Sequence, residues 1–348
     1  METPEALLMD SLMGTVRTQA LRTAIELGIP GLLSRGPRSA GALAVDCGCD
    51  PVAMRRLLFS LAASGVLEET PEGWFGLTRV GACLRPGSKG GIREYVQFVC
   101  DDALPAAAHL TELVRTGRGG SAFEAAKGRP FFAHLAEDRE AGARFDAAMN
   151  VSVSGLRDGI LDRDWRVSRT VADVGGGTGR LLAELLVRHP HLTAWLCEQR
   201  HVLDAAGPVL TEAGVEDRCV LAPCDFFTEV PEGLDVYLLV RVLHDWDTER
   251  ASRVLAAVRA AMRPDSRLLV ADLLLPSSPD AEGAAWRAAY DLYINLLLPG
   301  YERTAQQWHD LLASSGFRIE RTTEAGWRGS LLECVPDVSD VPEAPGEG

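Results

Sequence analysis

A histidine at the end of an apolar run is the strongest candidate for chemistry in this chain. Residues 239–247 are LVRVLHDWD, and His244 follows what is expected to be a buried strand. Open α/β sheets bind ligands beyond the carboxyl ends of their strands. A histidine with a pKa near ~6.5 accepts a proton from a hydroxyl at neutral pH. We interpret His244 as a general base; the alternative is a polar residue where a buried strand reaches the surface.

A glycine-rich loop follows another expected strand at residues 170–180, TVADVGGGTGR. Gly175, Gly177 and Gly179 let the backbone approach a ligand at the N-terminus of the next helix. The spacing from Asp173 is DxGxGxG, which differs from the GxGxxG fingerprint of dinucleotide sites. The loop alone is compatible with NAD, FAD, a nucleoside or a tight turn.

Two acidic residues at later strand ends narrow the choice of ligand. Glu198 ends the second expected strand, where a carboxylate can bind ribose hydroxyls; a solvated strand-end charge is the alternative. Asp225 precedes Phe226, which pairs a polar group with a flat apolar surface suited to an adenine ring. These residues predict an adenosine site without a pyrophosphate, which S-adenosylmethionine fits better than NAD.

The elements that must position these residues alternate between strands and helices. Short apolar runs lie at residues 170–174, 192–196, 219–223, 235–240 and 267–272, with helical stretches between them. This alternation predicts a parallel sheet covered by helices on both faces. Runs at 317–321 and 330–335 are expected to close it as an antiparallel edge pair. The predicted fold class is α/β, a Rossmann-like domain with a mixed, mostly parallel, seven-stranded sheet.

The N-terminal part has a different pattern. Residues 5–27 show helical apolar spacing, and residues 36–78 predict helix, turn, helix and a hairpin around residues 71–73, the order of a winged helix. A winged helix raises the alternative of a transcription regulator. The would-be recognition helix offers only Arg55 and Arg56, too few cations for useful phosphate contacts. A dimerisation scaffold is preferred.

Composition excludes several partners. The 35 basic and 49 acidic residues give a net charge of −14, which disfavours nucleic acid and anionic membranes. No apolar run approaches the ~18 residues of a membrane span, and the N-terminus lacks a signal-peptide pattern. The eight cysteines form no CxxC pair, so we expect reduced cysteines in a cytoplasmic protein. The acidic, proline-rich tail after about residue 336 is expected to be disordered.

Together these motifs resemble one family. VADVGGGTGR, CDFF, RVLHDWDTE, LLVADLLLP, PGYERT and GVLEETPEGWFGLT occur in the order and spacing of class I S-adenosylmethionine-dependent O-methyltransferases of the caffeic-acid and hydroxyindole type. Bacterial members of that family modify natural products. The resemblance implies a helical, winged-helix dimerisation domain at residues 1–105 and an intertwined homodimer. It also implies a helical linker and cofactor-binding catalytic domain at residues 106–348.

The resemblance also implies roles for individual residues. Those expected to line the cofactor, together with Asp173, are Gly175, Gly177, Glu198, Asp225, Phe226 and Arg241. His244 matches the base, and Asp272 and Glu302 match two glutamates that flank the base in plant members. Because Asp272 is one methylene shorter than glutamate, its contact with His244 is expected to be longer or to run through water.

The acceptor pocket is expected between the catalytic domain and helical residues 130–160. Phe132, Phe145 and Met149 match an apolar wall in relatives; ordinary helix core is the alternative, since Phe145 and Met149 share one helix face. Trp246 is placed at this site, with packing against the cofactor preferred to contact with substrate. Asn295 lies in an apolar stretch and needs either a substrate hydroxyl or a backbone partner; the pocket is preferred.

The expected reaction is an in-line methyl transfer to an aromatic hydroxyl of a small natural product or its precursor. A phenol has a pKa near ~10, so a base that takes its proton during transfer adds about 10²–10⁴-fold. No metal is expected, because no convincing cluster of carboxylate and amide oxygens can be assembled. Alternatives are a C- or N-methyltransferase acting on an aromatic amino acid, 2-oxo acid or amine, and a relative of the same fold that does not methylate.

Overall fold

Two compact units make up the chain in the computed structural model, which describes residues 3–88, 91–325 and 329–337. The first unit contains residues 1–105 and 138–151, and the second contains residues 106–137 and 152–348. The expected disordered tail, from residue 338 onward, lies outside the described residues. Within the described part of the chain, no helix is long and apolar enough to cross a membrane.

The first unit has the predicted helix, helix, hairpin order. Its elements are α1 (Pro4–Glu26), α2 (Ile29–Leu32), η1 (Leu33–Arg35), β1 (Arg38–Ser39), α3 (Ala40–Cys47), α4 (Pro51–Ala63), β2 (Leu67–Glu69), β3 (Trp74–Leu77) and η2 (Gly81–Leu84). Ser39 and Asp50 cap α3 and α4 by accepting the N–H groups of Ala42 and Ala53. The three strands form an antiparallel sheet in the order β1-β3-β2, so the predicted hairpin is confirmed.

A broken helical segment follows. It contains α5 (Ile92–Phe98), η3 (Val99–Ala103, a π-helix), η4 (Leu104–His109), α6 (Leu110–Thr116), α7 (Ser121–Lys127), α8 (Phe131–Glu137) and α9 (Arg139–Leu161). Residues 139–151 of α9 belong to the first unit and its remainder to the second. The chain therefore crosses between the units three times, once within η4, once directly after α8 and once within α9.

The second unit is the predicted α/β domain. Its strands are β4 (Thr170–Val174), β5 (Thr193–Glu198), β6 (Cys219–Pro223), β7 (Val236–Val240), β8 (Arg267–Leu275), β9 (Arg303–Thr304), β10 (Phe317–Ala325) and β11 (Gly329–Pro336). The strand order is β10-β11-β8-β7-β4-β5-β6, and the two-residue β9 pairs with β8. Strands β4 to β8 are parallel, and β11 is antiparallel to both β8 and β10. The mixed seven-stranded sheet and its edge pair are confirmed, with β9 as an addition.

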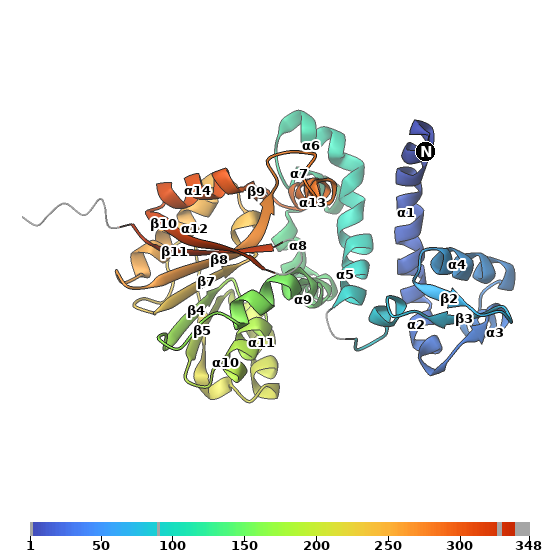
Figure 1. The fold of residues 1–348 in the computed structure, drawn as a ribbon, viewed down its shortest axis with the longest axis horizontal. Coiled ribbons are helices and arrows are strands. Elements are labelled where there is room, and N and C mark those ends of the chain that lie inside the picture. Colours follow the sequence, from blue (N-terminus) through green and yellow to red (C-terminus); the bar gives the residue numbers. More distant parts are fainter. Residues whose placement is uncertain (1–2, 89–90, 326–328, 338–348) are drawn as a thin grey trace, which may run out of the picture. The chain divides into compact units, whose positions relative to one another are not determined.

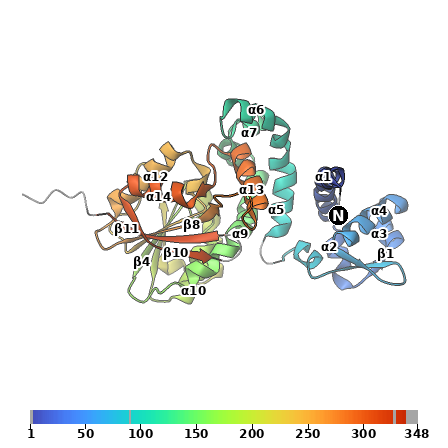
Figure 2. The same ribbon diagram turned by 45° about the horizontal axis from the view of Figure 1, so that its top comes forward.

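Helices cover both faces of this sheet (Figures 1 and 2). α10 (Arg180–Arg188) and α11 (Arg200–Glu212) lie on one face, and α12 (Thr248–Ala261) and α14 (Ala305–Ser314) lie on the other. The unit also contains η5 (Glu216–Arg218), η6 (Leu243–Asp245) and α13 (Ala284–Leu297), which packs on α7 and β8. Along β7, Val236, Leu238 and Val240 join the core under α10 and α11, while Tyr237 and Leu239 join the core under α12 and α14. This two-sided burial explains why the strand is apolar at every position.

Candidate active site

The turn after β7 places His244 in a buried position. Arg241, the first residue after the strand, has φ 57° and donates its backbone N–H to the carbonyl of Ala271 at 2.9 Å. The chain then forms η6, which carries His244, whose residue surface is 4% exposed. The predicted strand end and the histidine beyond it are therefore both present.

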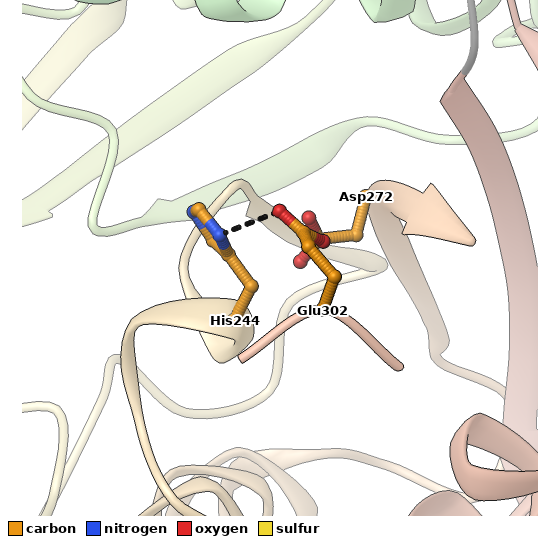
Figure 3. A group of neighbouring side chains, drawn as sticks. All are labelled: His244, Asp272 and Glu302. Atoms are coloured by element: carbon orange, nitrogen blue, oxygen red, sulfur yellow. Dashed lines mark hydrogen bonds and ion pairs between the residues drawn. The ribbon is translucent and has the colours of Figure 1, made fainter. Parts of the chain in front are cut away.

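Each ring nitrogen of His244 contacts a carboxylate. Nδ1 lies 3.1 Å from Oε1 of Glu302, and Nε2 lies 3.1 Å from Oδ1 of Asp245 (Figure 3 draws the first contact). A neutral imidazole has only one N–H to donate. The Nδ1 contact is a hydrogen bond in which the ring N–H donates to Glu302, and the Nε2 contact is an ion pair when the ring is protonated.

Arg241 and the carboxylates of Asp272 and Glu302 form a buried network beside His244. Nη1 of Arg241 bonds Oδ1 of Asp272, and Nη2 bonds Oε1 of Glu302 at 2.9 Å. Nη2 also donates to the hydroxyl of Tyr290 at 3.1 Å. The side chains of Arg241, Asp272 and Glu302 are 5%, 0% and 1% exposed. The network is thus closed to bulk water, which strengthens each charge–charge interaction.

Asp272 lies near the base but bonds Arg241. Its Oδ1 also accepts the N–H of Leu273 at 3.1 Å, and its buried Oδ2 has no hydrogen-bond partner among the described residues. In the described part of the chain, Nδ1 of His244 bonds Glu302 and Nε2 lies 3.1 Å from an oxygen of Asp245. The sequence predicts a longer contact between Asp272 and His244 than a glutamate would make. In the structure the Asp272 carboxylate bonds the guanidinium of Arg241, and the Glu302 carboxylate bonds His244.

The surroundings shift the pKa values of these groups. Burial and Arg241 lower the pKa of His244, but Asp245, Asp272 and Glu302 together outweigh them and raise it. Burial raises the pKa of Asp245 to about 6 despite the neighbouring His244. Burial also acts on Glu302, but Arg241 and His244 outweigh it and lower the pKa of Glu302 to about 2. Glu302 is therefore ionised at neutral pH.

The same side chains come close enough together to suggest a cation site. One donor atom from each of His244, Asp272 and Glu302 lies within 4.8 Å of the others. However, the guanidinium of Arg241 bonds both carboxylates and already neutralises charge between them. A divalent cation would have to displace or oppose this buried positive charge, and the absence of a metal stays a prediction.

Apart from Arg241, which follows β7, the residues predicted to line the cofactor lie at or just beyond the carboxyl ends of β4, β5 and β6. Gly175, Gly177 and Gly179 have φ values of 75°, 57° and 72°, which allow the loop to turn tightly before α10. Asp173 is buried, with its Oδ1 unpartnered among the described residues, and burial followed by Glu198 raises its pKa to about 7. A glycine loop beside the unpaired Oδ1 of Asp173 fits a ligand that carries amine or hydroxyl groups, because these groups can donate a hydrogen bond to that oxygen.

Glu198 and Asp225 end the neighbouring strands with polar groups. Glu198 accepts the N–H of Gln199 at 2.6 Å, and Asp225 accepts the N–H of Phe227 at 3.1 Å. The Phe226 ring lies 6.5 Å from that of Trp246. Carboxylates beside flat aromatic surface form the arrangement expected for a nucleoside.

The structure brings some of the predicted acceptor residues together. Phe132 stacks on Trp246 with ring centroids 5.6 Å apart and planes at 27°. Phe145 packs on Phe98 at 5.4 Å within the first unit, and the half-buried Met149 belongs to that unit too. The acceptor-binding roles of Phe132, Phe145, Met149 and Trp246 remain predictions.

Asn295 has backbone partners, the alternative that the sequence had left open. Its Nδ2 donates to the carbonyl of Gly300 at 2.9 Å, and its own carbonyl accepts the N–H of Gly120 at 2.9 Å. A Cβ at Gly300 would lie 2.0 Å from the carbonyl oxygen of His244. Asn295 thus holds the segment at Gly300, which packs against the backbone of the turn that carries His244. A contact between Asn295 and substrate stays a prediction.

Three features of this site were not found from the sequence. Asp245 was not assigned a role, although its adjacency to the base could have suggested the Nε2 contact. Tyr290 lies on α13 and has no motif that would connect it with Arg241. The pairing of Arg241 with the carboxylates was also missed, because the sequence assigned that residue to the cofactor.

Two family models match the chain. The model of the O-methyltransferase domain matches residues 107–318, and that of the O-methyltransferase dimerisation domain matches residues 9–86. The chain belongs to the O-methyltransferase family. The fold class and the family resemblance predicted from the sequence are thereby confirmed.

This O-methyltransferase is similar to proteins of bacterial natural-product biosynthesis. It is 37% identical over 328 residues to a mitomycin biosynthesis 6-O-methyltransferase of Streptomyces lavendulae, covering 92% of this chain and 91% of that protein. It is 35% identical over 332 residues to the phenazine O-methyltransferase PhzM of Lysobacter antibioticus, covering 95% and 96%.

A solved structure of the family contains the expected cofactor. The O-methyltransferase NcsB1 from neocarzinostatin biosynthesis, in complex with S-adenosylmethionine and 2-hydroxy-5-methyl naphthoic acid, has a TM-score of 0.77 and 27% identity, covering 92% of this chain and 95% of that one. The present chain is an S-adenosylmethionine-dependent methyltransferase.

Some relatives differ in their reaction. The chain is 35% identical over 320 residues to an 8-amino-8-demethylriboflavin N,N-dimethyltransferase of Streptomyces davaonensis, covering 90% of each. It is 33% identical over 325 residues to the aclacinomycin 10-hydroxylase RdmB of Streptomyces purpurascens, covering 91% of this chain and 86% of that protein. Membership of the family therefore does not by itself identify the atom that accepts the methyl group, and the geometry of the site has to indicate it.

Proposed function

We propose that this enzyme transfers the methyl group of S-adenosylmethionine to a hydroxyl on an aromatic ring of a small natural product, with His244 as the general base. The observation that carries the proposal is the contact between Nδ1 of His244 and ionised Glu302 at 3.1 Å. This contact fixes the tautomer and directs Nε2 away from Glu302 as the proton acceptor.

Asp245 occupies the position at Nε2 that an acceptor hydroxyl needs. An acceptor that reaches His244 therefore takes the place of the Asp245 oxygen, which lies 3.1 Å from Nε2. In the active form Nε2 of His244 carries no proton, since a doubly protonated imidazole cannot accept another. Nε2 then takes the hydroxyl proton as the oxygen attacks, and Glu302 stabilises the imidazolium that forms.

The cofactor supplies an electrophilic methyl group on a sulfonium sulfur. The residues proposed to hold it are Asp173, Gly175, Gly177, Glu198, Asp225 and Phe226, at the carboxyl ends of the parallel strands. Burial of His244 and its carboxylates excludes water from the proton transfer. A fixed base next to a held acceptor converts the reaction into an oriented, effectively intramolecular step.

The stacked rings of Phe132 and Trp246 support an aromatic acceptor. Their planes lie at 27°, and Trp246 is two residues beyond the base, so a flat surface adjoins the reacting histidine. Aromatic rings prefer to pack against such surfaces with offset stacking. We assign the acceptor-facing role to these two residues, with Phe145 and Met149 as further candidates.

We also propose that two copies of this chain pair through α1. The match to the dimerisation domain supports a homodimer. On α1, Leu8, Leu12 and Val16 are 68%, 62% and 60% exposed and lie on one helical face. Exposing such a row of apolar side chains to water is unfavourable, so the face is expected to pack against a second copy. Leu8→Asp combined with Leu12→Asp is expected to lower the mass measured by light scattering to one chain, whereas Val167→Asp at another exposed valine leaves the dimer intact.

The reaction is tested with isotope-labelled methyl donor and a panel of aromatic acceptors. The panel spans phenols, catechols, hydroxynaphthoates, aromatic amines, aromatic amino acids and 2-oxo acids, and product mass spectra locate the label. Label on a phenolic oxygen is the expected result. Label on nitrogen or carbon, with no oxygen product from any phenol, would replace the proposal by one of the alternatives.

A further inference from the structure

Arg241 has the most unusual backbone among the site residues. It is the one non-glycine residue with positive φ in the part of the chain that the structure describes. An arginine in the left-handed region is strained, and such strain persists only where surrounding contacts over-determine the conformation. The conformation turns the side chain of Arg241 toward β8 and the segment before β9, where its guanidinium is almost completely buried.

The guanidinium connects the two carboxylates that flank the base. Nη1 bonds Asp272, and the Oε1 atom of Glu302 accepts from both Nη2 of Arg241, at 2.9 Å, and Nδ1 of His244, at 3.1 Å. Tyr290 supports the other side, since its hydroxyl accepts from Nη2 and its ring centroid lies 5.5 Å from the guanidinium carbon. A planar fork of donors suits this arrangement better than a point charge.

We propose that Arg241 is a positioning residue of the methyl-transfer reaction, which binds Asp272 and Glu302 together so that a single carboxylate oxygen orients Nδ1 of His244. The inference rests on the proposed role of His244 as a base. It assigns Arg241 a task that differs from the sequence expectation, in which this residue lines the cofactor.

Charge balance around His244 gives this arrangement a functional consequence. The groups that face the ring are Arg241 after β7, Asp245 on η6, Asp272 on β8 and Glu302 before β9. Arg241 is the one cation among them, and it opposes the three carboxylates that favour the protonated ring. Removing it leaves the carboxylates unopposed, so His244 holds its proton to higher pH.

The experiment measures the titration of His244 directly. The protein is labelled on histidine, and the His244 resonance is identified by its absence from the spectrum of His244→Gln. Wild type is compared with Arg241→Met, which removes charge and donors, and with Arg241→Lys, which keeps the charge. Tyr290→Phe is the matched control, because it removes one contact of Arg241 and leaves every charge in place.

Arg241→Met is expected to raise the pKa of His244 by about one pH unit or more and to move the acid limb of the kcat/KM profile to higher pH by the same amount. Arg241→Lys and Tyr290→Phe are expected to leave that pKa close to the wild-type value. S-adenosylmethionine affinity, measured by calorimetry, is expected to stay within about threefold in all three variants. If Arg241→Met does not fold, Arg241→Gln carries the same prediction.

An unchanged His244 titration in the folded Arg241→Met or Arg241→Gln variant would overturn the proposal. A tenfold loss of cofactor affinity together with an unchanged titration would assign Arg241 to the cofactor instead. Failure of the proposed function would give a different result. Wild type would methylate no acceptor, while the His244 titration would still show whether Arg241 lowers the pKa of His244. The two inferences are therefore tested separately.

Discussion

Oε1 of Glu302 lies 3.1 Å from Nδ1 of His244 and, at the same time, 2.9 Å from Nη2 of Arg241. One carboxylate oxygen thus joins the base to the guanidinium of Arg241. The low pKa of Glu302 follows from this double contact, because both neighbours favour its ionised form over the cost of burial. The orientation and the proton affinity of His244 depend on the same atom.

Replacing Glu302 is expected to reduce turnover severely. Glu302→Gln keeps the shape but removes the charge that stabilises the imidazolium, so kcat should fall by about 10²–10⁴-fold. Removing a carboxylate from Nδ1 also lowers the pKa of His244. Steady-state kinetics across pH measure both effects. Asp272→Asn serves as the comparison, since Asp272 bonds Arg241, and a larger loss in Asp272→Asn than in Glu302→Gln would contradict the assigned order.

Replacing Asp245 is expected to shift the pH dependence in one direction. Asp245 raises the pKa of His244 through the Nε2 contact. In Asp245→Asn the ring loses its proton more easily, so the acid limb of the kcat/KM profile should move to lower pH. A profile measured with a saturating concentration of cofactor reports this shift. Movement of the limb to higher pH would show that Asp245 does not raise the pKa of His244.

Asp173 is expected to destabilise the ligand-free fold as the pH rises. Its folded-state pKa is about 7, above the value in an unfolded chain, because burial disfavours the carboxylate. The associated stability is present at low pH and is lost as the pH rises through about 7, by an amount on the order of a few kcal/mol. Asp173→Asn should therefore gain in Tm relative to wild type between about pH 5 and about pH 8. An equal Tm difference at both values would contradict the assignment.

Gly300 is expected to tolerate no side chain. A Cβ there would lie 2.0 Å from the carbonyl oxygen of His244, so Gly300→Ala must displace the turn that carries the base. Turnover should fall by at least about tenfold, since small misplacements of catalytic groups are costly. The control is Gly207→Ala within α11, where a Cβ meets no atom within 4 Å. Equal activity of Gly300→Ala and Gly207→Ala would show that the close approach is unimportant.

The sequence was sufficient for features that repeat locally. The apolar alternation predicted the strands of the sheet, and glycines and acids at strand ends marked the carboxyl edge where the site lies. Strands such as β7 are buried on both faces, so they carry an unbroken apolar pattern that is visible without a structure. The same applies to His244, which directly follows such a strand.

Contacts between distant segments could not be predicted in this way. Arg241 and Tyr290 meet because α13 packs beside β8, and no periodicity in either segment encodes that meeting. Asn295 is similar: a polar residue in an apolar helix signals a partner, but only the fold identifies the carbonyl of Gly300 as that partner. The sequence assigned Arg241 to the cofactor, whereas the structure pairs it with Asp272 and Glu302. This difference also arises because contacts between distant segments leave no local pattern.

The proposed reaction depends on His244 as the proton acceptor, so the decisive measurement compares His244→Ala with wild type. Labelled-methyl transfer to an aromatic acceptor and cofactor binding by calorimetry are measured on both, with His309→Ala, an exposed histidine on α14, as the control. The account predicts a loss of turnover of about 10²–10⁴-fold in His244→Ala with unchanged cofactor affinity, and a fully active control. A His244→Ala variant that methylates at the wild-type rate would contradict the central claim.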